Sequence, residues 1–168
     1  MARHPHHENP YPTPAEVHAH AAAARERKRS EAYAIGIDEG FISEFVDRFY
    51  ARIRGDALLG PIFAKRIEDW DWHLNRMNRF WRSILHNSGE FSGNPMAKHL
   101  AIPGLEEGHF AHWLELFYET LRELERDPDA TELVSMRARM IADSLLTGIA
   151  VQSGGLAKAR AGGNLPHV

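Results

Sequence analysis

Histidine, tyrosine and tryptophan are the side chains with which this sequence could do chemistry, because its 168 residues include no cysteine. Disulfides, zinc–thiolate sites, iron–sulfur clusters and thiol nucleophiles are thereby excluded. Eleven histidines are present, and a neutral imidazole is a common metal ligand. Any bound metal or metal cofactor must therefore be held by nitrogen or oxygen.

Four side chains on predicted inward helix faces are candidates for one site: Tyr50, His73, His99 and Trp113. A buried tyrosine hydroxyl needs a hydrogen-bond partner, and haem iron is often held by one histidine. Together they suggest a pocket between helices, with an imidazole on iron and a phenol, an imidazole and an indole facing a gas ligand. Taken singly, each is more often a core residue than part of a ligand site.

Other histidines have simpler explanations. His109 and His112 are three residues apart, so they could share a metal, or they could be neighbours on a partly exposed helix. His86 lies near a predicted helix C-terminus, where the helix dipole favours it. Five of the eleven histidines fall within the first 20 residues and indicate a polar surface.

The first 37 residues are expected to form a flexible and helical extension. Residues 1–12 are polar and interrupted by proline, which favours loose structure. Thr13, Pro14 and Glu16 form a capping box with proline at the first helical position. The helix that follows has few large apolar residues, so we expect a peripheral arm. Its cluster RERKR (25–29) is interpreted as a solvated face.

A single domain is expected over residues 38–154. Apolar residues from Phe41 to Ile53 follow a helical period, and further helices are predicted near 69–86, 95–102, 106–125 and 128–153. Asn94 and Pro95 begin the short helix at 95–102 as its cap and first residue. No alternating strand pattern occurs, so the fold class is all-α. The tail 155–168 is expected to be disordered.

Charge and hydropathy narrow the class of protein. Twenty Lys and Arg against 23 Asp and Glu give a net charge of −3, which offers no electrostatic argument for nucleic acid binding. No apolar run approaches the roughly 20 residues of a membrane span, and the polar N-terminus is unlike a secretory signal. We expect a cytoplasmic protein.

Four sequence blocks resemble the truncated haemoglobins, specifically their third group. The blocks are FYARIRGDALLGPIF (49–63), DWHLNRMNRFW (71–81), GNPMAKHLAIP (93–103) and HFAHWLELF (109–117). They lie in the family's order across about 100 residues. The Gly-Gly hinges of groups one and two are missing, which favours group three. The resemblance implies a truncated globin fold, a two-over-two helical sandwich, here with an N-terminal helical extension.

The resemblance also implies a haem b cofactor and a role for each matched residue. His99 matches the proximal iron ligand, and it is preferred to His109 because Pro95 fixes the start of its short helix. Distal positions match Tyr50, His73 and Trp113. Phe63 matches a phenylalanine on the haem face, and Arg76 falls where a basic residue meets a haem propionate. Further haem contacts or neighbours are Met77, Phe80, Trp81, Leu100, Ile102 and Phe110.

The expected function is binding of O₂, CO and NO at a histidine-ligated iron. Donors opposite the iron stabilise the partial negative charge on a bound ligand and slow its release, which suits ligand chemistry better than delivery. Nitric oxide detoxification or peroxidase-like activity would need a reductase that the sequence does not identify. We expect a monomer or a weak homo-oligomer. The alternative is a helical metal- or partner-binding module without haem.

Overall fold

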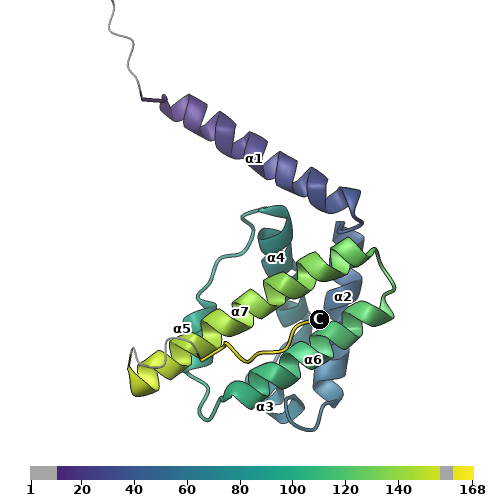
Figure 1. The fold of residues 1–168 in the computed structure, drawn as a ribbon, viewed down its shortest axis with the longest axis vertical. Helices are drawn as coiled ribbons and strands as arrows, with labels where there is room; N and C mark the ends of the chain where they lie inside the picture. The colour runs from purple at the N-terminus through teal and green to yellow at the C-terminus, as the bar shows by residue number, and fades with distance from the viewer. Residues whose placement is uncertain (1–10, 156–160) are drawn as a thin grey trace, which may run out of the picture.

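The computed structural model describes residues 11–155 and 161–168. Helices are its regular elements (Figure 1), and the described residues contain no strand. The helices are α1 (Pro14–Ala34), α2 (Glu39–Gly55), α3 (Gly60–Ala64), α4 (Trp70–His86), α5 (Pro95–Leu100), α6 (Glu107–Glu123) and α7 (Pro128–Gly154). The predicted all-α class is therefore confirmed.

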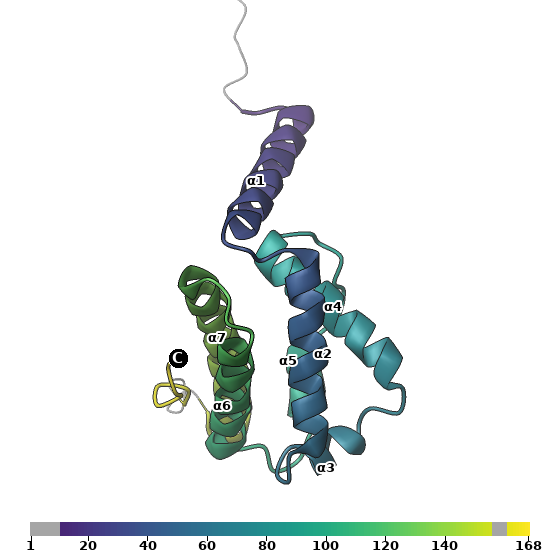
Figure 2. The same ribbon diagram turned by 90° about the vertical axis from the view of Figure 1, so that its right-hand side faces the viewer.

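The four long helices of the domain lie in two layers. Figure 2 shows α2 and α4 on one side and α6 and α7 on the other, and α2 packs against both α4 and α6. The core between the layers is aromatic: Phe45 and Phe49 of α2 meet the Phe117 ring of α6 at 4.5 and 5.1 Å between centroids. This arrangement is the expected two-over-two sandwich.

Local caps set the helix starts as the sequence predicts. The Thr13 hydroxyl accepts from the Glu16 amide at 3.3 Å, and the Glu16 carboxylate accepts from the Thr13 amide at 2.7 Å. Asn94 accepts from the Ala97 amide at 3.0 Å and begins α5, with Pro95 at its first position. Each cap satisfies an amide that lacks a partner in the helix.

The extension α1 joins the domain only near its C-terminal end. Ala32 is its one buried residue, and the Tyr33 ring lies 5.2 Å from that of His86 at the end of α4. His86 lies in the last turn of α4, as the sequence predicts, and it is also buried at 3% exposure. Its Nε2 donates to the Ile37 carbonyl at 2.7 Å. A hydrogen bond thus joins the residues just after α1 to the end of α4.

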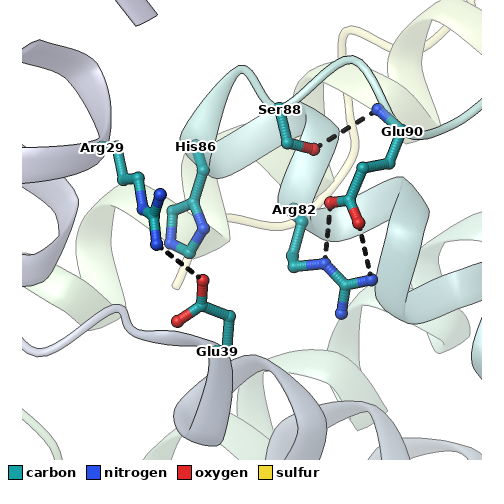
Figure 3. A pocket seen from close by; sticks show the side chains of 6 residues that line it. All are labelled: Arg29, Glu39, Arg82, His86, Ser88 and Glu90. Carbon is teal, nitrogen blue, oxygen red and sulfur yellow. Dashed lines mark hydrogen bonds and ion pairs between the residues drawn. The ribbon is translucent and has the colours of Figure 1, made fainter. Parts of the chain in front are cut away.

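A polar pocket of about 270 Å³ marks this junction (Figure 3). Its charges are largely paired within the pocket, because Arg29 lies 3.2 Å from Glu39 and Arg82 lies 2.8 Å from Glu90. Tyr33 also donates to Glu39. The pocket therefore belongs to the attachment of α1.

The C-terminal tail differs from the expected disorder in its described part, residues 161–168. Leu165 is only 2% exposed. The Tyr118 hydroxyl donates to the Pro166 carbonyl at 2.9 Å, and Arg139 donates to the Leu165 carbonyl at 3.2 Å. Burial of Leu165 and hydrogen bonds from Tyr118 and Arg139 thus hold residues 161–168 against the domain, although their composition alone suggests fraying. Residues 156–160 lie outside the described part of the tail, as do residues 1–10 of the extension.

The described helices do not contain a span of the length and hydropathy that crossing a membrane requires.

Candidate functional site

Tyr50, His73 and Phe63 come together from three different helices. Tyr50 lies on the buried stripe of α2, His73 on α4 and Phe63 on α3. The Tyr50 ring centroid is 5.1 Å from that of His73, nearly perpendicular at 84°, and 6.0 Å from that of Phe63. The edge-to-face geometry is the favourable one for aromatic rings. Three of the predicted pocket residues are therefore neighbours.

Burial sets the protonation of the two polar rings. Tyr50 is 6% exposed, and desolvation raises the pKa of its phenol above the ordinary value, so the hydroxyl keeps its proton. Burial, with the nearby positive charge of Arg76, lowers the pKa of His73 to about 4. At neutral pH the site therefore contains an uncharged phenol and an uncharged imidazole.

The imidazole of His73 has a buried nitrogen without a partner in the described part of the chain. The His73 Nε2 atom is buried and makes no hydrogen bond to the described residues. A buried polar group without a partner costs about 1–3 kcal/mol. Such an atom suits a site in which a ligand supplies the missing partner.

Trp113 reaches the same region through Phe49. Its ring lies 5.3 Å from Phe49, perpendicular at 89°, and Phe49 lies 5.1 Å from Tyr50. Trp113 is partly buried on α6. Since an indole N–H can only donate, Trp113 adds a donor on the α6 side of the group.

His99 is oriented by the backbone of its own helix. Its Nδ1 lies 2.7 Å from the Pro95 carbonyl oxygen, and because a carbonyl can only accept, Nδ1 carries the hydrogen. The neutral ring then has its lone pair on Nε2. A ring fixed through one nitrogen with the other free is the usual state of a metal-ligating histidine.

The short helix that carries His99 is held against α7. Met96 lies against Gly148, where a Cβ atom would come within 2.4 Å of the Met96 sulfur. The glycine therefore allows α5 to approach α7 closely. His99 also faces Phe110 of α6, with ring centroids 6.5 Å apart.

Several other predicted cofactor residues are only partly buried. The long helix α4 packs against α2 and α1, whereas α5 packs against α7. Apolar side chains on α4, α5 and the turn after it are left partly accessible: Met77, Phe80, Leu100 and Ile102. Partly accessible apolar side chains on these segments suit a flat apolar cofactor.

Trp81 and Phe110, also expected near the cofactor, are buried. Trp81 packs on Phe45 and Phe117 of the aromatic core. Its described contacts are those of a core residue.

Arg76 lies between two aromatic rings. Its guanidinium carbon is 5.4 Å from the Trp72 ring centroid and 4.9 Å from that of Phe91. It also lies against Gly93, in the loop just before α5. This stacking keeps a positive charge beside the segment that leads to His99.

The two histidines of α6 make hydrogen bonds of their own. His109 accepts from the Glu106 amide at 3.1 Å and so caps its helix. His112 bonds to Asp56 at 2.7 Å, and this bond raises its pKa. No three His, Asp or Glu side chains of the described residues gather into a metal site.

Trp70 is the site residue that sequence reasoning missed. Its ring centroid lies 6.4 Å from that of Tyr50 and 5.7 Å from that of His73. The spacing of three residues between Trp70 and His73 was the available signal, because it places both on one helix face.

The residues present fit a haem group. His99 has a free Nε2, His73 has an unpaired Nε2, and aromatic rings lie beside both histidines. A histidine-ligated iron with polar groups opposite it would use each of these features.

The chain is similar to known proteins in both sequence and fold. The chain is 34% identical over 110 residues to the group 3 truncated haemoglobin ctb of Campylobacter jejuni subsp. jejuni serotype O:2, covering 63% of this chain and 86% of that protein. Its fold is similar to the crystal structure of the group III truncated haemoglobin from Campylobacter jejuni, with a TM-score of 0.63 and 32% identity, covering 67% of this chain and 91% of that one. No protein-family model matches the chain.

Proposed function

The chain belongs to the group 3 truncated haemoglobins, and from this premise we propose that it binds haem b through His99 and holds O₂, CO or NO on the opposite side. Tyr50, His73 and Trp113 are the proposed distal residues. Phe63, Met77, Phe80, Leu100, Ile102 and Phe110 are proposed to contact the macrocycle or lie beside it, and Arg76 to meet a propionate.

The observation that carries this proposal is the orientation of His99. Its Nδ1–H donates to the Pro95 carbonyl at 2.7 Å. The Nε2 lone pair is therefore available without any change of tautomer, and the hydrogen bond makes it a stronger ligand. The hydrogen bonds that occupy His109 and His112 favour His99 over either of them.

Bound haem supplies an iron with an open coordination position for a diatomic ligand. The chain contributes the polar groups around that position. The Tyr50 hydroxyl remains protonated and can donate, the Trp113 indole can only donate, and neutral His73 can donate or accept. Each bond to a partly negative ligand is worth about 1.5–3 kcal/mol.

Slow ligand release is the consequence of several donors in a buried site. This favours redox chemistry on the ligand, such as nitric oxide detoxification or peroxidase-like turnover, over oxygen transport. Such chemistry consumes electrons, so it requires a separate reductase. The proposal for redox activity rests on the donor set alone and is secondary to the proposal for ligand binding.

Haemin titration of the purified full-length chain tests the proposal. We expect one equivalent of haemin to give a sharp Soret band, and reduction under CO to shift that band. Free haemin in the same buffer is the control. A chain that gives only the broad spectrum of free haemin would favour the alternative, a helical module without haem.

A further inference from the structure

Trp70 completes a closed group of three rings with Tyr50 and His73. The centroids are 5.1 Å apart for Tyr50 and His73, 5.7 Å for Trp70 and His73 and 6.4 Å for Tyr50 and Trp70. The Trp70 and His73 planes are nearly perpendicular at 84°. Each ring thus lies within 6.4 Å of the other two.

The first turn of α4 fixes where Trp70 lies. Asp69 caps the helix by accepting from the Trp72 amide at 2.9 Å, and its carbonyl accepts from the His73 amide at 3.1 Å. Trp70 is the first helical residue and His73 follows three positions later. Both side chains therefore lie on one face of a capped turn.

Arg54 holds Trp70 from the other side. Its guanidinium carbon lies 4.7 Å from the Trp70 ring centroid, a cation–π distance. Arg54 is in the last turn of α2, the helix that carries Tyr50. The contact therefore joins the end of α2 to the start of α4, and these are the two helices that carry Tyr50 and His73.

The Nε2 atom of His73 is more deeply buried than the residue as a whole. The residue as a whole is only partly buried, yet its Nε2 is fully buried. The charged and titratable groups placed around it by the described contacts are Tyr50 on α2, Arg54 through Trp70, and Arg76 on α4. None of them is an anion that could stabilise an imidazolium.

We propose that Trp70, held in place by Arg54, is a positioning residue that keeps the His73 ring against Tyr50 and shields both from water. The inference rests on the proposed function in calling this pair distal. Trp70 itself is not proposed to touch the ligand. It acts by fixing the orientation and hydration of the two groups that do.

Titration of His73 tests this role without haem. The full-length, haem-free chain would be followed by ¹H–¹⁵N NMR of its histidine rings, in wild type and in Trp70→Ala. We expect the pKa of His73 to rise from about 4 toward its ordinary value near 6.5, because water would reach the ring. Trp70→Phe keeps an aromatic ring and should retain most of the depression of this pKa.

Trp72→Ala is the matched control. Trp72 is a tryptophan in the same turn, but it is 61% exposed and stacks on Arg76 rather than on His73. We expect the His73 pKa to stay near 4 in this variant. If Trp70→Ala does not fold, Trp70→Leu keeps apolar bulk without the ring and should give a smaller rise. A His73 pKa near 4 in the folded Trp70 variant would overturn the inference.

A second readout uses the haem-loaded chain. CO rebinding after flash photolysis should change in Trp70→Ala by several-fold and stay at the wild-type rate in Trp72→Ala. Failure of the wild-type chain to take up haem would refute the proposed function, while the titration in the haem-free chain would still report on Trp70. The two failures are therefore distinguishable.

Discussion

Replacing Tyr50 with phenylalanine removes one hydroxyl and leaves the ring that packs on Phe49, Phe63 and His73. Tyr50 is 6% exposed, and its hydroxyl makes no hydrogen bond to the described protein groups. The hydroxyl is therefore a desolvated donor whose bond to a partly negative ligand meets little competition from water. We expect that bond to contribute about 1.5–3 kcal/mol to ligand binding.

This free energy corresponds to about 10- to 100-fold in an equilibrium constant. Since changes of this kind fall mainly on dissociation, O₂ should leave Tyr50→Phe about 10- to 100-fold faster than wild type. Stopped-flow mixing of the oxygenated protein with excess CO measures that rate. CO, which carries less negative charge when bound, should dissociate at a rate that changes much less.

Tyr118→Phe provides the matched control. It also removes a tyrosine hydroxyl, but one that donates to the Pro166 carbonyl at 2.9 Å in the C-terminal tail. Its O₂ dissociation rate should equal that of wild type. An unchanged rate in Tyr50→Phe, with haem bound, would refute the reasoning and leave Tyr50 as a packing residue.

Three further predictions concern charge. The pKa of His73 is about 4 in the folded chain and near 6.5 when unfolded, so the unfolded state binds the proton first as pH falls. Because His73 is partly exposed and solvent screens its charge, the free energy of unfolding of wild type should fall by about 1–2 kcal/mol between pH 6.5 and 4 on account of this group. Urea unfolding of the haem-free proteins at pH 7.5 and 4.5 measures this loss of stability. His73→Leu should not show it, and an equal loss in wild type and variant would contradict the prediction. The hydrogen bond to Asp56 raises the pKa of His112, so the pair stabilises the folded chain at low pH and ceases to do so as pH rises through that pKa. The resulting loss of stability should be less than about 1 kcal/mol, and it should be missing in His112→Gln. Arg76→Met should release haem several-fold faster to an excess of apomyoglobin, and an unchanged rate would exclude a propionate contact.

Helix starts were predictable because their signals are local. Thr13 with Glu16 and Asn94 with Pro95 are short patterns in which a side chain satisfies an amide within three residues, and the structure confirms both. The inward stripe of α2 is similar, since a helical period alone selects the buried face that carries Tyr50.

Contacts between distant segments were not predictable from one sequence. Asp56 and His112 are 56 residues apart, and nothing in either local pattern indicates their bond. The tail composition likewise suggested fraying, because the contact of Leu165 with the core depends on how α6 and α7 pack. Trp70 was overlooked for the same reason, since a helix face indicates burial but not its partners.

Whether His99 ligates the iron is tested most directly by the Soret absorbance of the haemin-titrated chain in His99→Ala and in His109→Ala. His109 is the matched control, because it is the neighbouring histidine that caps α6. We expect His99→Ala to lose the sharp Soret band and added imidazole to restore it, while His109→Ala should keep the wild-type spectrum. A wild-type Soret band in His99→Ala, or its loss in a folded His109→Ala, would contradict the account.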